Sequence, residues 1–413
     1  MSTAMRPFSK AYKVGRSHRI AWPQTERSVE NRSELRLDIR RRNRRIISSL
    51  ALICMCGGLS SCGTGGPRFT PHSALPPAAV RIARDGGADS ARSSSASVPF
   101  RFFSPSSFWN RRLTADAPLD PGSAARMSAF IRELATEVRS GRAPWVNTVN
   151  SGIPVYTVSL RQPIVPVHLE DHSPDAALSS AWKSVPLPPD AEPTGGPDGS
   201  LVVWQPSTDR LWEFHQLVHK ASGWYASWGG AMRHVSSNPG VFQRKAWPGA
   251  KPWWGISASS LSLVGGLISV EDVELGQINH ALEMAVPQRS ASIFIAPAQR
   301  TDGTSTSPLA LPEGAHLRLN PNVNLAALHL PRFTLMLAKA AQRYGIFITD
   351  GTGVSGVTAF FAQDPVSTAA GFYIGSDGHI EGESPSRLLA TFPWSQLQLL
   401  KMTPRRVGSA RRR

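Results

Sequence analysis

The chain has 413 residues, with 41% hydrophobic and 18% charged side chains and a formal net charge of +16. This length and apolar content argue for a globular body of one large or two ordinary domains, and against a mostly disordered or fibrous chain. The excess charge lies near the termini: residues 1–61 contain 13 Lys and Arg against four Asp and Glu, residues 401–413 contain six against none, and residues 93–400 contain 22 against 23. Because phosphate binding requires clustered basic side chains, we expect no nucleic-acid partner for the neutral body.

The N-terminal region carries a targeting signal. Five arginines within residues 40–45 precede an apolar run over residues 46–59, and Leu59-Ser60-Ser61-Cys62 follows. A charged region, an apolar stretch of this length and small residues before a cleavage site are typical of a secretory signal. The Leu-Ser-Ser-Cys string resembles the lipobox of bacterial lipoproteins, whose Cys is lipidated and becomes the first mature residue. The sequence predicts attachment by a lipid on Cys62 to the extracellular face of the cell membrane; a short uncleaved anchor or a buried apolar segment is the alternative.

Cysteine usage limits the chemistry of the mature chain. Cys54 and Cys56 lie inside the apolar run and would be removed with it, which leaves Cys62 alone. A disulfide, a thiolate metal site and a Cys nucleophile are then excluded. The sequence also lacks a Gly-x-Ser-x-Gly elbow, a Walker-type loop and a Gly-x-Gly-x-x-Gly fingerprint, which argues against serine esterase, nucleotide and nicotinamide chemistry. We expect no cofactor and no metal.

Composition divides the remainder of the chain. Residues 62–98 are rich in Gly, Pro, Ser, Ala and Arg, which predicts a flexible tether. Residues 99–403 are expected to form a single globular domain. Residues 404–413 are expected to be a basic disordered tail.

Periodicity predicts three helices and a sheet-rich remainder. The helices are expected at residues 121–139, 269–286 and 331–344, and the second begins with a capping-box pattern, Ser269-Val270-Glu271-Asp272. Strands are expected at residues 201–205, 211–218 and 224–229, as an antiparallel meander, and at residues 154–160, 164–169, 292–296, 316–319, 345–349 and 357–362. The predicted class is α+β, with a mainly antiparallel sheet, sandwich- or barrel-like, and about three packed helices.

Strand alternation places Glu213 and His215 side by side on one face. A carboxylate beside an imidazole can perform acid–base chemistry, although a solvated outer face of a half-buried strand is the alternative. On the predicted helix, His280 and Glu283 lie three residues apart, either solvated or facing a cleft. Their spacing is not that of a zinc protease.

Two further polar positions follow predicted strands. Arg300 and Asp302 lie in a loop where they could bind a polyhydroxylated or acidic ligand, or could pair with each other. Asp350 precedes Gly351 and is most simply a turn residue.

Tryptophan is concentrated in one part of the chain, because seven of the 12 lie between residues 204 and 254. Trp224 and Trp228 are expected on one face of one strand, and Trp253 and Trp254 lie in a loop rich in Gly and Pro. Flat apolar faces with a polar edge suit sugar rings, and core packing is the alternative.

Several motifs resemble those of a family of uncharacterised secreted actinobacterial proteins. The matching strings, which span nearly the whole body, are Ser106-Ser107-Phe108-Trp109-Asn110, Leu211-Trp212-Glu213-Phe214, Trp228-Gly229-Gly230-Ala231, Gly265-Gly266-Leu267-Ile268, Gly276-Gln277-Ile278-Asn279-His280-Ala281-Leu282, Pro297-Ala298-Gln299-Arg300 and Arg343-Tyr344-Gly345-Ile346 with Asp350. The resemblance implies export and a single domain, with Glu213, His280, Arg300 and Asp350 at motif positions. It implies no particular activity. The chain departs from the family pattern at His215, Ala296 and Glu283.

These observations favour a surface lipoprotein that binds or cleaves an extracellular polysaccharide in an aromatic-lined cleft. Cleavage would need two carboxylates beside the glycosidic bond. Glu213 is the first candidate and Asp350 or Asp302 the second, with His280 and Arg300 assisting. The alternative is a non-catalytic envelope protein, in which these residues are scattered or held in core hydrogen bonds.

Overall fold

The computed structural model describes residues 101–148, 151–170, 174–352, 356–367, 380 and 383–407. The predicted signal, the lipidation site at Cys62 and the tether lie outside these residues. Ser95–Arg413 form one compact unit. In the described part of the chain, no helix has both the length and the apolar character needed to cross a membrane.

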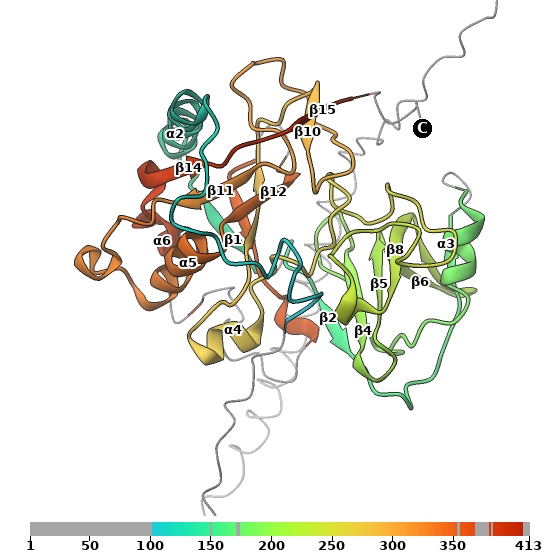
Figure 1. The fold of residues 1–413 in the computed structure, drawn as a ribbon. Coiled ribbons are helices and arrows are strands. Elements are labelled where there is room, and N and C mark those ends of the chain that lie inside the picture. The colour runs from blue at the N-terminus through green and yellow to red at the C-terminus, as the bar shows by residue number, and fades with distance from the viewer. Residues whose placement is uncertain are drawn as a thin grey trace, which may run out of the picture. The chain divides into compact units, whose positions relative to one another are not determined.

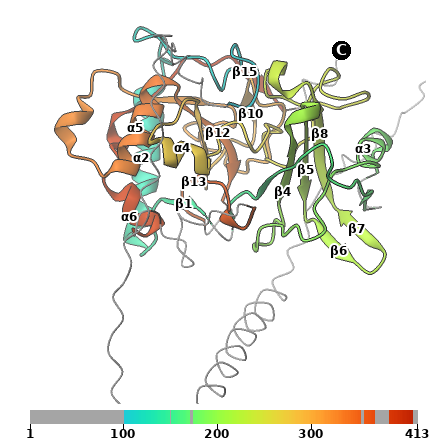
Figure 2. The same ribbon diagram turned by 90° about the horizontal axis from the view of Figure 1, so that it is seen from below.

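A mixed six-stranded sheet organises one half of the fold (Figure 1). Its order is β1 (Trp145–Asn147), β13 (Ala359–Phe361), β9 (Leu282–Val286), β12 (Ile346–Gly351), β11 (His316–Leu319) and β14 (Leu397–Leu399). The helices α2 (Ser123–Arg139), α5 (Arg332–Arg343) and α6 (Pro385–Ala390) contact its strands. Figure 2 shows these helices on the side of the sheet away from β4, β5 and β8. Their apolar faces and the strands share one core.

The other half of the fold contains two smaller sheets and a second core. The four-stranded sheet has the order β2 (Val155–Thr157), β4 (Leu201–Gln205), β5 (Arg210–His215) and β8 (Trp228–Arg233). The three-stranded sheet has the order β3 (Val167–Leu169), β7 (Gly223–Ala226) and β6 (Val218–Lys220), and the short helix α3 (Ala176–Ala181) contacts β3 and β8. Short 3-10 helices occur at Pro206–Thr208, Val235–Ser237, Leu325–Leu328, Pro365–Ser367 and Trp394–Gln396.

A two-stranded sheet pairs β10 (Ile293–Ile295) with β15 (Pro404–Arg406). The prediction of a disordered tail from residue 404 is therefore wrong for its first three residues. Antiparallel backbone pairing, continued by a hydrogen bond of 3.0 Å from Val407 N to Ser292 O, holds them beside β10. Backbone hydrogen bonding does not depend on the charge of the side chains, so composition gave no sign of it.

The predicted α+β class is confirmed. The described residues contain five α-helices and strands that do not close into a barrel. Antiparallel pairs predominate, but four pairs are parallel: β1 with β13, β9 with β12, β2 with β4, and β3 with β7. The predicted helices at residues 121–139 and 331–344 are confirmed as α2 and α5.

The single helix predicted for residues 269–286 is wrong. The capping box of Ser269 and Asp272 begins α4 (Val270–Leu275), but Gly276 ends it with φ of 66°. After the loop, Leu282–Val286 form β9, which is buried on both faces between β12 and β13. A strand buried on both faces carries a continuous apolar run. Such a run cannot be distinguished by periodicity from the apolar face of a helix, and this led to the helical prediction.

The predicted meander is also corrected. The β4 and β5 strands pair as expected, but β5 ends at His215 and Gln216 takes φ of 52°. The β6–β7 hairpin then leaves for the three-stranded sheet, and β8 returns to pair with β5. Trp224 on β7 and Trp228 on β8 therefore do not share one strand.

Candidate functional site

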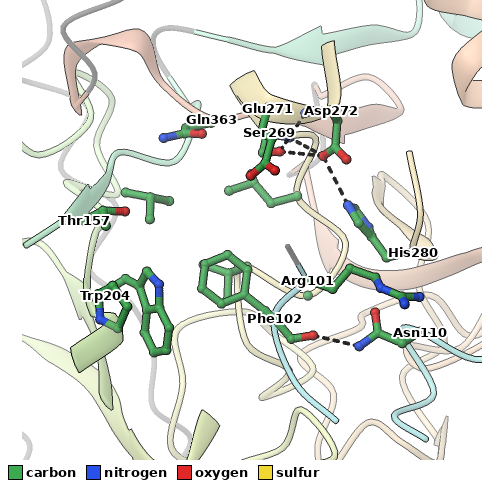
Figure 3. A pocket seen from close by; sticks show the side chains of 15 residues that line it. Arg101, Phe102, Asn110, Thr157, Trp204, Ser269, Glu271, Asp272, His280 and Gln363 are labelled. Atoms are coloured by element: carbon green, nitrogen blue, oxygen red, sulfur yellow. Dashed lines mark hydrogen bonds and ion pairs between the residues drawn. The ribbon is translucent and has the colours of Figure 1, made fainter. Parts of the chain in front are cut away.

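A cavity of about 320 Å³ lies where the N-terminal segment of the domain meets β2, β4 and the start of α4 (Figure 3). We name it the aromatic pocket, and its lining includes Arg101, Phe102, Thr157, Trp204, Glu271 and His280. These side chains come from four parts of the chain that are far apart in the sequence. The pocket is therefore a product of tertiary folding.

One wall of the aromatic pocket is formed by two aromatic rings. The centroids of Phe102 and Trp204 lie 5.5 Å apart with the rings at 69°, an edge-to-face arrangement. Trp204 belongs to β4, where pairing with β5 fixes its backbone. Neither residue is among the ligand-binding residues predicted from the sequence. Trp204 is, however, one of the seven tryptophans between residues 204 and 254.

The opposite wall is polar and centres on Asp272 (Figure 3). Asp272 Oδ2 accepts hydrogen bonds from Ser269 N at 2.9 Å and Ser269 Oγ at 2.6 Å, and it lies 3.2 Å from His280 Nε2. The other ring nitrogen, His280 Nδ1, lies 2.9 Å from the carbonyl oxygen of Ala281. Because both ring nitrogens face acceptors, this geometry suits the doubly protonated imidazolium.

The charge of His280 follows from these contacts. Burial by itself would lower the pKa of His280, but the charge of Asp272 and the hydrogen bonds to Asp272 and Ala281 outweigh it, so the pKa is raised. With Arg101, Glu271 and Asp272, the lining then combines groups of both signs. A wall that carries both positive and negative side chains offers hydrogen-bond donors and acceptors without favouring a ligand of one charge.

A second group of polar residues lies between the two halves of the fold. We name it the acidic cluster, and it comprises Glu213 of β5, Glu283 of β9, Asp350 of β12, and Glu313. Glu213 and Glu313 are 0% exposed, and Glu283 is 1% exposed. Each of these three glutamates has one carboxyl oxygen without a hydrogen-bond partner.

Burial is the main influence on the acidity of the cluster. Burial raises the pKa of Glu213 to about 7, although hydrogen bonds from Ser262 and Leu263 favour the charged form. Burial and the charge of Asp302 raise the pKa of Asp350 to about 7. For Glu283, burial and the charges of Glu213 and Asp350 raise the pKa well above its ordinary value. Desolvation and like charges both favour the protonated acid.

Two arginines border the acidic cluster. Arg289 pairs with Asp302 at 2.7 Å and approaches Glu313 at 3.4 Å. Arg300 donates to the carbonyl oxygens of Gly255 and Ser257 at 3.3 and 2.9 Å. Burial lowers the pKa of Arg300, against the charges of Glu313, Asp350 and Asp302.

The structure thus brings three of the five predicted polar site residues, Asp350, Asp302 and Arg300, into electrostatic contact, and Glu213 joins them only through Glu283. Glu213, Asp350, Asp302 and Arg300 belong to the acidic cluster or its border, whereas His280 lies in the aromatic pocket. The solvated alternative for Glu213 is wrong, because its side chain is 0% exposed and Ser262 and Leu263 lie against its carboxylate. The helical pairing of His280 with Glu283 is also wrong, since β9 carries Glu283 into the cluster.

The tryptophans proposed as sugar platforms are mostly part of the core. Trp254 is 0% exposed, and its Nε1 donates to Asp175 Oδ2 at 3.1 Å. Trp224 is buried and stacks on His219 with 4.5 Å between ring centroids, and Trp228 is half-buried. An open binding role for Trp224 and Trp254 is therefore wrong. Trp253, which is 50% exposed, remains a candidate.

Across the described residues, no group of three or more His, Cys, Asp or Glu side chains is arranged to hold a metal ion. No protein-family model, no curated protein and no solved structure matches this chain.

Proposed function

We propose that this protein binds a neutral saccharide unit of an extracellular polysaccharide in the aromatic pocket. The observation that carries the proposal is the position of the Phe102 and Trp204 rings across the cavity from the polar wall of Ser269, Glu271 and Asp272. A sugar ring presents an apolar face to aromatic carbons and hydroxyls to polar groups. A cavity of about 320 Å³ is at the small end of the ligand-site range, which suits one or two sugar rings.

We further propose that the site binds the saccharide without cleaving it. Glycosidic cleavage requires two carboxyl groups at the bond. The lining of the aromatic pocket contains two carboxylates, Glu271 and Asp272. Asp272 Oδ2 is already engaged by Ser269 and His280, so the pocket does not offer two unengaged carboxyl groups to a glycosidic bond. Burial of Glu213 and Glu283 also keeps these acids away from a soluble substrate.

The proposed location is the outer surface of the cell membrane, with a lipid on Cys62. The arginines before the apolar run and the Leu59-Ser60-Ser61-Cys62 string support it. The near-neutral composition of residues 93–400 agrees with a neutral ligand.

Calorimetric titration with neutral gluco-, manno-, xylo-, arabino- and galacto-oligosaccharides tests the binding proposal. The full chain carrying Cys62→Ser would be compared with the same chain carrying Phe102→Ala or Glu271→Gln. Each pocket variant is expected to weaken binding by about tenfold, which corresponds to about 1.4 kcal/mol. Trp253→Ala is the matched control, because it removes an exposed aromatic ring outside the pocket.

Loss of binding in Trp253→Ala with full binding in Phe102→Ala would move the site to the loop of Trp253. If no oligosaccharide binds the chain that carries Cys62→Ser alone, the proposal is rejected and a structural or protein-binding role is favoured.

A further inference from the structure

The acidic cluster and the aromatic pocket share one stretch of chain, which we name the bridging segment (residues 262–269). At its start, Ser262 Oγ donates a hydrogen bond to Glu213 Oε1, and Leu263 N donates to the same oxygen at 3.0 Å. Further along, Gly266 O accepts a hydrogen bond of 3.2 Å from Glu283 N. The bridging segment is therefore held between the two buried glutamates.

The same segment forms part of the pocket wall. Val264, Gly265, Leu267 and Ser269 all line the aromatic pocket. Gly266 lies so close to Glu283 that a Cβ on it would be 2.4 Å from Glu283 N and 2.7 Å from Glu283 Cβ. A displacement of the Glu283 backbone or Cβ would therefore press on this segment, because close-packed atoms leave little room to absorb it.

Glu283 is surrounded by groups that favour a proton on it. The charged groups that act on it are Glu213 from β5 and Asp350 from β12, both acids, and their effect outweighs that of the Thr349 hydroxyl, which favours the charged form. The arginines of the cluster border are engaged elsewhere, Arg289 with Asp302 and Glu313, and Arg300 with backbone carbonyls. On β5, His215 interacts with Asp198 and Arg300. Glu283 Oε1 and Glu213 Oε2 both lack hydrogen-bond partners, so the Ile256 backbone N–H near Glu213 and the Thr349 hydroxyl near Glu283 would compensate two negative charges here only in part.

We propose that a proton held by the pair Glu213 and Glu283 keeps the bridging segment in place, and that its loss at alkaline pH loosens this wall of the aromatic pocket. The singly protonated pair carries one charge, which the Ser262 and Leu263 donors stabilise on Glu213. Removal of the remaining proton places a second charge beside it. Repulsion in a buried site then favours states that admit water around the segment. The proposal adds pH control to the saccharide site and in that respect rests on the proposed function.

Amide hydrogen exchange of the ligand-free protein tests the proton-held segment without any saccharide. After correction for the intrinsic dependence on pH, protection of residues 262–269 is expected to fall as the pH is raised above about 7, by up to about tenfold per pH unit once the pair loses its remaining proton. In Glu283→Gln, whose amide cannot ionise, protection should stay constant across this range. Equal protection of the unsubstituted protein at pH 6 and 9, or an equal fall in Glu283→Gln, would overturn the proposal.

Glu213→Gln repeats the comparison should Glu283→Gln fail to fold, because it also removes one of the two charges. Glu137→Gln is the matched control. Glu137 is buried and burial raises its pKa, but its carboxylate accepts hydrogen bonds from Thr358 and not from the bridging segment. Its variant should retain the fall in protection.

Titration with the neutral oligosaccharides at pH 6 and 9 separates the two proposals. If the segment loosens with pH but no oligosaccharide binds at pH 6, the proposed function fails and the proton-held segment stands. If an oligosaccharide binds equally at both pH values, the coupling fails and the proposed function stands.

Discussion

The indole ring of Trp109 lies directly against Gly265, so that a Cβ on Gly265 would be 2.2 Å from Trp109 Cε2. Trp109 is fully buried, and it also packs on Gly240. Because Gly265 lines the aromatic pocket as well, this contact ties a pocket wall to the core. We therefore expect Gly265→Ala to lower the free energy of unfolding by about 1 to 3 kcal/mol through overpacking.

Urea denaturation followed by tryptophan fluorescence would measure the effect of Gly265→Ala. Gly122→Ala is a suitable control, since the nearest atom to its added Cβ is Asp120 Oδ1 at 3.1 Å, on a side chain that can move. Equal stability of the two variants would contradict tight packing at Trp109.

Asp175 should stabilise the fold through both of its carboxyl oxygens. Oδ1 accepts hydrogen bonds from Ala177 N and Leu178 N, both at 3.0 Å, at the start of α3, and Oδ2 accepts from Trp254 Nε1 at 3.1 Å. Asp175→Ala removes the cap and leaves a buried indole donor unpaired, at an expected loss of about 1 to 3 kcal/mol. Asp175→Asn keeps one capping oxygen and should lose less. The urea midpoints of the two variants would rank them, and a larger loss in Asp175→Asn would be inconsistent with capping.

The acidic cluster should make the protein more stable at mildly acidic pH. The pKa of Glu213 is raised to about 7 in the folded state, so between about pH 4.5 and 7 the folded chain binds more protons than the unfolded chain. The free energy of unfolding should then fall as pH rises through this range, by up to about 3 kcal/mol for Glu213, and level off above it. Glu213→Gln should reduce this dependence in urea titrations at pH 5 and 8. An unchanged pH dependence in the variant would remove Glu213 from this role.

His316 should produce the opposite dependence at lower pH. Its Nε2 lies 2.8 Å from Tyr344 O, and its ring stacks on Phe347 with 3.9 Å between centroids. Burial lowers the pKa of His316 to about 4, so between about pH 4 and 6.5 the unfolded chain binds the extra proton. This contribution to stability is present above pH 6.5 and is lost as pH falls toward 4. The C2 proton signal of His316 in a pH titration by NMR would report it, and a midpoint at or above 6.5 would contradict it.

Lipid attachment predicts a simple fractionation result. The expressed chain should be found in the membrane fraction with its N-terminus at a modified Cys62, as measured by mass spectrometry of the mature protein. Cys62→Ser should release it to the soluble or secreted fraction. Retention of the unprocessed residues 40–59 in the mature chain would instead favour the uncleaved anchor.

The sequence alone determined the elements whose signals are local. Apolar spacing located α2 and α5, and the capping box located the start of α4. Turn residues separated β4 from β5. These features depend on residues within one or two turns of each other, so they can be recognised without knowledge of the partner strands.

Tertiary structure decided the rest. The last part of the helix predicted for residues 269–286 became β9 because β12 and β13 pair with it on both edges, and pairing partners distant in sequence are not visible in periodicity. The same pairings decided which acids lie together: the buried Glu213 and Glu283 and the half-buried Asp350 meet only through β5, β9 and β12. Phe102, Trp204 and the bridging segment likewise form the aromatic pocket only once the two halves of the fold pack, since burial depends on the neighbours that each side chain acquires in space.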